Sequence, residues 1–124
     1  MSDPGPARRR SIGIVFADGG LLALSASGAR HGEEEIATVL CGPDGGPVEV
    51  SETLLSTEYG PDGVQRRATL EMWTDEKAQP LRGAGTLISA TAIDRPGLRT
   101  TVAFFRWSVE GREGLGHYEV VHDG

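Results

Sequence analysis

The sequence has a single cysteine, Cys41, and this scarcity excludes several classes of protein. One thiol forms no intramolecular disulfide and builds no thiolate metal site, so a cytoplasmic setting is predicted. No basic residue flanks Cys41 to stabilise a thiolate, and no histidine forms a recognisable nucleophile motif with it. We therefore interpret Cys41 as a small buried hydrophobe.

Basic charge is also scarce. Lysine and arginine number 12 against 18 aspartate and glutamate residues, which gives a formal net charge of −6. That sign repels a phosphate backbone, so nucleic acid is not a predicted partner. The run Arg8 to Arg10 is the exception. It lies in a Pro- and Gly-containing leader, where it is either simply solvated or contacts an acidic partner.

Long apolar runs and signature motifs are missing too. No stretch has the length of a signal peptide or a membrane span. There is no Gly-x-Ser-x-Gly elbow, Walker loop or dinucleotide fingerprint, so hydrolase, kinase and nucleotide-cofactor functions have no support and no cofactor is predicted. His31 beside Glu33 to Glu35 lacks the spaced second and third ligands that zinc needs, so no metal is predicted and a solvated acidic turn is favoured.

Glycine is abundant, with 18 residues, and it recurs after an acidic residue in pairs typical of tight turns. The pairs are Asp18-Gly19, Asp44-Gly45, Asp62-Gly63 and Glu110-Gly111. Such pairs suit the positive backbone angles of hairpin loops, and their flanks are rich in β-branched, aliphatic and aromatic residues. Antiparallel hairpins are therefore predicted throughout.

About eight strands are predicted, with little helix, because alternation with period two outweighs any helical spacing. They are Ile12–Phe16, Leu21–Ala26, Ile36–Leu40, Val48–Tyr59, Gln65–Thr74, Leu81–Ile93, Thr100–Val109 and Leu115–Val121. We expect residues 1–11 to be a flexible leader and residues 12–124 to be one all-β domain. An antiparallel up-and-down β-barrel is favoured because closure removes exposed edges; a sandwich is the alternative.

Alternation divides the strands into faces. Thr101, Ala103, Phe105, Trp107 and Val109 oppose Val102, Phe104, Arg106 and Ser108. Both faces of this strand are apolar in the middle, and such a strand needs cover on both sides. One cover is the barrel interior; the other is a second domain, a subunit or a loop.

Four polar residues are candidates for catalysis. His117 and Glu119 share one face of the last strand and, if inward, would supply a general acid and base; a solvated surface pair is the alternative. Arg106 lies in an apolar strand and needs a partner, for which Glu71 is a candidate; otherwise its guanidinium extends along Trp107 to solvent. An inward Arg106 and Glu71 would orient a ligand carboxylate or carbonyl.

The aromatic residues are candidates for ligand contact. Trp73, Phe105 and Trp107 would pack against a flat or conjugated ligand, and Tyr118 would place its hydroxyl at the barrel rim. Packing in the core is the alternative role for each of them.

Three segments together resemble a known family. They are Gly13-Ile14-Val15-Phe16-Ala17-Asp18-Gly19, then Glu58-Tyr59-Gly60-Pro61-Asp62-Gly63 followed by Arg67-Ala68-Thr69-Leu70-Glu71, and finally the run from Arg106 to Glu119 with its Gly-Arg-x-Gly-x-Gly succession. The arrangement resembles the carboxy-terminal half of the hydroxyneurosporene synthase, or carotenoid hydratase, superfamily, over roughly residues 12 to 121.

The resemblance implies a lipocalin-like barrel that binds an apolar or polyene-like small molecule. The superfamily includes hydratases and related cyclases, so a cofactor-free hydratase, isomerase or cyclase of specialised metabolism is one hypothesis. A non-catalytic carrier, or a module that docks to a second lipocalin-like half, is the other. Such proteins usually carry two halves and this chain has one, so a homodimer or a separate partner half is expected.

Overall fold

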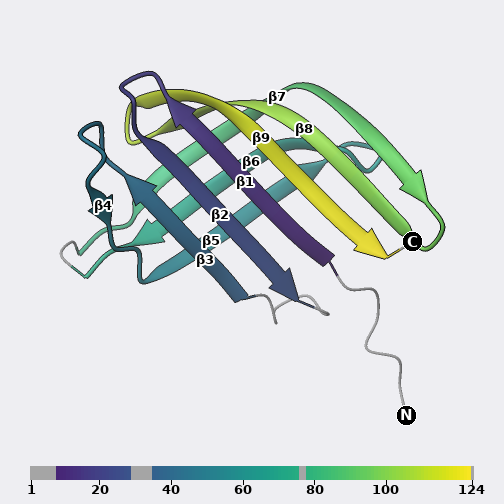
Figure 1. Cartoon of the computed structure of the whole chain (residues 1–124), viewed down its shortest axis with the longest axis horizontal. Coiled ribbons are helices and arrows are strands. Elements are labelled where there is room, and N and C mark those ends of the chain that lie inside the picture. The colour runs from purple at the N-terminus through teal and green to yellow at the C-terminus, as the bar shows by residue number, and fades with distance from the viewer. Residues whose placement is uncertain (1–7, 29–34, 76–77, 124) are drawn as a thin grey trace, which may run out of the picture.

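The fold is a single antiparallel β-sheet curled into a half-barrel (Figure 1), seen in a computed structural model that describes residues 8–28, 35–75 and 78–123. The strands are β1 (Arg8–Phe16), β2 (Leu21–Gly28), β3 (Glu35–Cys41), β4 (Pro47–Val48), β5 (Glu52–Tyr59), β6 (Gln65–Trp73), β7 (Leu81–Arg95), β8 (Leu98–Val109) and β9 (Arg112–Asp123). The prediction of an all-β, up-and-down, barrel-like fold is confirmed.

The sheet is a meander in which the first and last strands of the chain, β1 and β9, pair with each other. Its order is β4-β3-β2-β1-β9-β8-β7-β6-β5, so β1 pairs with β9 and the two ends of the sheet are β4 and β5. The barrel is therefore open between two strands that follow one another in the chain. Near this opening, the hydroxyls of Thr38 on β3 and Thr53 on β5 share a hydrogen bond of 2.8 Å.

Most predicted strand bounds shift by a few residues, and two differences are larger. The strand expected at Val48–Tyr59 is split into β4 and β5, because Val48 pairs with Leu40 on β3 while Glu52 pairs with Trp73 on β6. The chain crosses the opening between the two, which raises the count to nine strands. In addition, β1 begins at Arg8, inside the predicted leader, because β2 and β9 both extend far enough to pair with it. Residues 1–7 of that leader lie outside the described residues.

The predicted turns form, with one refinement. Glu110 and Gly111 both have positive φ, at 49° and 79°, as a two-residue loop between antiparallel strands requires. In the other three pairs only the glycine has a positive φ. There the aspartate Oδ1 accepts a hydrogen bond from the backbone N–H two residues later, at Gly20, Gly46 and Val64, which holds the turn closed.

The core lies on the concave face, with the alternation predicted from the sequence. Phe105, Trp107 and Tyr118 are fully buried there, with ring centroids 5.3 Å apart for Phe105 and Trp107 and 5.7 Å for Phe105 and Tyr118. Gly85 on β7 makes room for them, since a Cβ at that position would lie 2.5 Å from Cε3 of Trp107. Side chains of β1, β2 and β6 complete the same cluster, so the curled sheet encloses one core.

Candidate functional site

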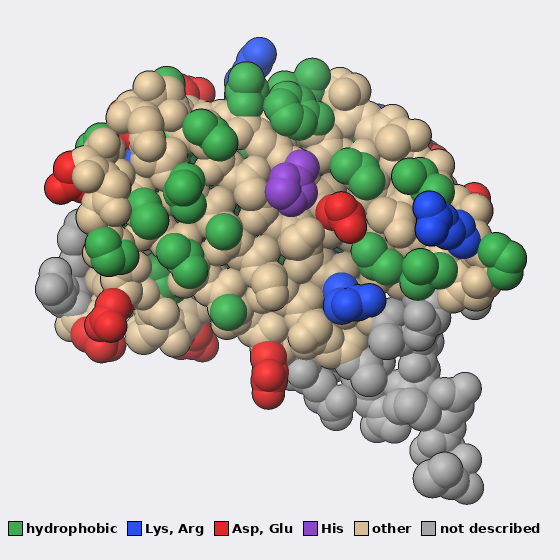
Figure 2. Space-filling model, in the orientation of Figure 1, with side chains coloured by type: hydrophobic (Ala, Val, Ile, Leu, Met, Phe, Trp, Pro, Cys, Tyr) green, Lys and Arg blue, Asp and Glu red, His purple; other side chains and the backbone are tan. Residues whose placement is uncertain are grey.

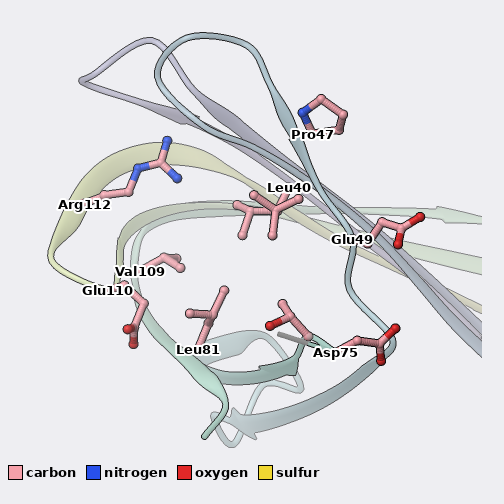
Figure 3. A pocket seen from close by; sticks show the side chains of 10 residues that line it. Leu40, Pro47, Glu49, Asp75, Leu81, Val109, Glu110 and Arg112 are labelled. Atoms are coloured by element: carbon pink, nitrogen blue, oxygen red, sulfur yellow. The ribbon is translucent and has the colours of Figure 1, made fainter. Parts of the chain in front are cut away.

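One candidate site is a pocket of about 520 Å³ at the end of the half-barrel where the β8–β9 turn lies. Its walls come from the β3–β4 region, the β6–β7 connection and the β8–β9 hairpin (Figure 3). It is lined by Leu40, Pro47, Val48, Glu49, Thr74, Asp75, Leu81, Val109, Glu110 and Arg112. Its size falls within the range of small-molecule sites in proteins.

The lining of this pocket is mixed, with nearly as much polar as apolar surface, and three aliphatic side chains form its apolar part. Figure 3 shows Leu40, Leu81 and Val109 turned toward the space between them, while the carboxylates of Glu49 and Asp75 point away from it. Leu40 and Val109 belong to the buried core, and Leu81 packs against it. The pocket therefore presents apolar surface that continues the core toward solvent.

Two of the charged groups on the rim have protein partners. Arg112 donates two hydrogen bonds to the Asp18 carboxylate, at 2.6 Å from Nε and 2.9 Å from Nη2, and a third to the Cys41 carbonyl at 3.3 Å. Its guanidinium carbon also lies 4.2 Å from the centroid of the Phe16 ring. Glu110 accepts a hydrogen bond of 2.8 Å from the backbone N–H of Arg82. These two side chains hold the rim together.

The ion pair shifts the titration of both members. Hydrogen bonding to Arg112, together with the Gly20 backbone N–H, lowers the pKa of Asp18 from its ordinary 3.8 to about 2. The same hydrogen bonds raise the pKa of Arg112 above its ordinary value. Both groups are therefore charged throughout the physiological range.

The four residues predicted as catalytic candidates lie away from this pocket, on the convex face. Arg106 and His117 are exposed there, and Glu119 and Glu71 are half-buried. Glu71 pairs with Arg82 across β6 and β7, with 3.7 Å between its Oε2 and Arg82 Nε, because β7 separates it from β8. The expected pairing of Glu71 with Arg106 is therefore corrected.

His117 and its neighbours show what this convex face is like. The imidazole lies over Gly13 of β1, where an added Cβ would be 2.6 Å from His117 Cε1, and Phe104 is its neighbour on β8. Exposed hydrophobic side chains are spread over the face formed by β1, β2 and β9 (Figure 2). A hollow of about 490 Å³ lies between Val15, Leu115 and Arg106.

The predicted ligand-contacting aromatics divide between the two faces. Phe105, Trp107 and Tyr118 are on the concave face, fully buried within the core, whereas Trp73 is half-buried on the convex face. None of the four lines the 520 Å³ pocket. The three buried rings instead fill the half-barrel behind it.

A polar cluster at the opposite end of the half-barrel was not predicted. Arg10 is 6% exposed and its Nη1 donates a hydrogen bond to the Tyr118 hydroxyl at 3.4 Å, while Thr57 bonds that hydroxyl at 2.6 Å. The Gln65 amide reaches the backbone oxygens of Tyr118 and Thr101, at 3.0 and 3.4 Å. Burial raises the pKa of Tyr118 above its ordinary 10.

The sequence allows the positions of Arg10 and of some pocket residues to be predicted, but not those of the others. Continuing the alternation of Phe16, Ile14 and Ile12 backward places Arg10 on the concave face. Val109 shares the face of Trp107 by the same rule. Alternation does not identify Leu40, Val48 and Leu81 as pocket residues. They lie far apart in the sequence and come together only when the chain folds.

Among the described residues, no group of three or more His, Cys, Asp or Glu side chains is placed to hold a metal ion. His31, Glu33 and Glu34 of the acidic turn lie outside those residues. No helix in the described part of the chain is long and apolar enough to cross a membrane. Comparison with protein-family models and with curated proteins finds no match.

Proposed function

We propose that this chain is a lipocalin-like domain that binds an apolar small molecule in the pocket at the β8–β9 end of the half-barrel. The observation that carries the proposal is the pocket itself, a volume of about 520 Å³ whose apolar walls include Leu40, Leu81 and Val109. Burial of apolar ligand surface against such walls contributes about 25 cal/mol per Å². The resemblance to the carotenoid hydratase superfamily supports the same class of ligand.

The proposal is for binding and sheltering rather than catalysis. A hydratase, isomerase or cyclase needs acid and base groups that converge on the substrate. Here Arg112 is held by Asp18, Glu110 by the Arg82 backbone, and the carboxylates of Glu49 and Asp75 point outward. The proposal therefore gives no catalytic role to His117, Glu119, Arg106 or Glu71.

Pairing with a second copy is the other part of the proposal. Val102 is half-buried and Phe104 is 43% exposed on the convex face, so the second cover expected for this strand is absent from the described part of the chain. A homodimer supplies a second half without requiring another protein. The cytoplasmic setting stays a prediction.

Native mass spectrometry tests the binding proposal. The chain purified without denaturation is expected to carry an apolar small molecule that is released on unfolding. Leu81→Trp, which fills the pocket, is expected to remove that added mass. Leu115→Trp places the same indole at an exposed position on the convex face and is expected to keep it. Equal retention by both variants would overturn the assignment to this pocket.

A further inference from the structure

The second half of β7 forms an open edge of the sheet. On one side, β8 pairs with β7 from Gly83 to Arg95. On the other side, β6 pairs only from Leu81 to Thr86. The segment from Leu87 to Arg95, here called the β7 edge, therefore has a strand on one side only among the described residues. Figure 1 shows it running beside β8 at the margin of the molecule.

This edge lacks most of the features that keep edges from pairing. Residues 88–93 read Ile-Ser-Ala-Thr-Ala-Ile, without charge or proline, and every one of them is exposed. Ile88 and Ile93 are 49% and 47% exposed. Natural edge strands are protected by lysine, proline, bulges or covering loops, and a long uncharged edge presents free N–H and C=O groups to another strand. The protective features here lie at the two ends of the edge: the bulge between Leu87 and Ser89 at its start, and Asp94, Arg95 and the following Pro96 at its end.

We infer that the β7 edge pairs with the β7 edge of a second copy of this chain, antiparallel, about a two-fold axis at Thr91. The inference rests on the proposed pairing of two copies, and it places their contact at this sheet edge instead of over Phe104 on the convex face. In this register Ala90 lies opposite the partner's Ala92, and Ser89 opposite the partner's Ile93. Residues that face each other then lie on the same side of the sheet, as an antiparallel ladder requires.

The charge pattern of the edge suits a second copy as the occupant. Each chain carries a net charge of −6, but the central residues of the edge are neutral, so two copies can approach each other there. In the proposed register Asp94 lies opposite the partner's Ile88, and Arg95 opposite the partner's Leu87, so no two opposed residues of the ladder carry like charges. Arg99 also lies 3.7 Å from Asp94 within the chain and balances its charge. The surface is thus self-complementary, as a two-fold interface must be.

Sedimentation equilibrium with a lysine scan tests the inference. The wild-type chain is expected to be a dimer of 13.1 kDa subunits. Thr91→Lys would set two lysines opposite each other at the two-fold axis and is expected to weaken dimerisation roughly tenfold or more. Thr69→Lys is the matched control, because Thr69 is also an exposed threonine but has a strand on both sides. It is expected to leave dimerisation unchanged.

Cross-linking tests the register. In a Cys41→Ser background, Thr91→Cys is expected to form a disulfide between copies, because opposed residues have Cα atoms about 4.5–5.5 Å apart. Ile93→Cys faces the partner's Ser89 and is expected not to cross-link. A dimer unaffected by Thr91→Lys would overturn the β7 edge as the interface and leave the pairing of two copies intact. A wild-type monomer at high concentration would overturn both, and neither result touches ligand binding.

Discussion

The Arg112 guanidinium holds the Asp18 carboxylate through two hydrogen bonds, 2.6 and 2.9 Å long, and lies over the ring of Phe16. This relationship joins the first turn of the chain to the start of the last strand, on the rim of the pocket. A third bond to the Cys41 carbonyl extends it to β3. Arg112, the one cationic group that lines the pocket among the described residues, therefore has a structural role.

The ion pair predicts a pH dependence of stability. The pKa of Asp18 is lowered to about 2, so its stabilising effect is complete above the ordinary value of 3.8 and is lost as pH falls through about 2. Asp18→Asn is expected to melt below the wild type at neutral pH. The difference between the two melting temperatures should shrink as pH is lowered toward 2. A difference that stays constant down to that pH would contradict the ion-pair account.

The hydrogen bond between two threonine hydroxyls beside the opening of the barrel predicts that substitutions of these threonines have coupled effects on stability. Thr38 and Thr53 are 2.8 Å apart at their Oγ1 atoms, and Thr53 is 7% exposed. Thr53→Val is expected to lower the free energy of unfolding by about 1–3 kcal/mol, because it leaves the Thr38 hydroxyl without this partner. The double variant with Thr38→Val should recover part of the loss. Additive losses in a double-mutant cycle of urea unfolding would show that the contact does not join β3 to β5.

The burial of Trp107 predicts that two substitutions at this position differ greatly in their cost to stability. Trp107→Ala is expected to cost about 3–5 kcal/mol, because the indole is fully buried against Phe105. Trp107→Phe should cost much less, since it keeps most of the volume and removes an indole N–H that has no hydrogen-bond partner among the described residues. Unchanged melting of Trp107→Ala would show that the ring is not part of the core.

The burial of the Tyr118 phenol predicts a loss of folding stability at alkaline pH. Burial raises its pKa above the ordinary 10, so the folded chain favours the neutral phenol and the unfolded chain loses its proton first. Stability should therefore fall as pH rises above about 10. Ultraviolet absorbance of tyrosinate is expected to show a late step, coincident with unfolding, that Tyr118→Phe lacks. Ionisation of Tyr118 in the folded chain at its ordinary pKa would contradict its burial.

The strands and their faces could be predicted because β-structure has a short period. Alternation alone assigns Phe105 and Trp107 to one face and Phe104 and Arg106 to the other, and the structure has the same assignment. What alternation leaves open is which face is concave. Burial in the folded chain settles that point, because Trp107 is fully buried whereas Phe104 on the opposite face is 43% exposed.

The pocket could not be predicted from local patterns. Its walls are separated by tens of residues in the chain, and they meet only because the meander opens between β4 and β5. Phe105, Trp107 and Tyr118, which the sequence favoured as ligand contacts, fill the core instead. From the same hairpin, Val109, Glu110 and Arg112 line the pocket.

A fluorescence titration with the neutral apolar probe N-phenyl-1-naphthylamine tests the central claim most directly. The wild-type chain is expected to bind the probe with enhanced emission, and Leu81→Trp is expected to weaken that binding at least tenfold. Leu115→Trp, which adds the same indole to the hollow on the convex face, should bind as the wild type does. Weakened binding in Leu115→Trp, with normal binding in Leu81→Trp, would contradict the account and place the ligand on the outer surface.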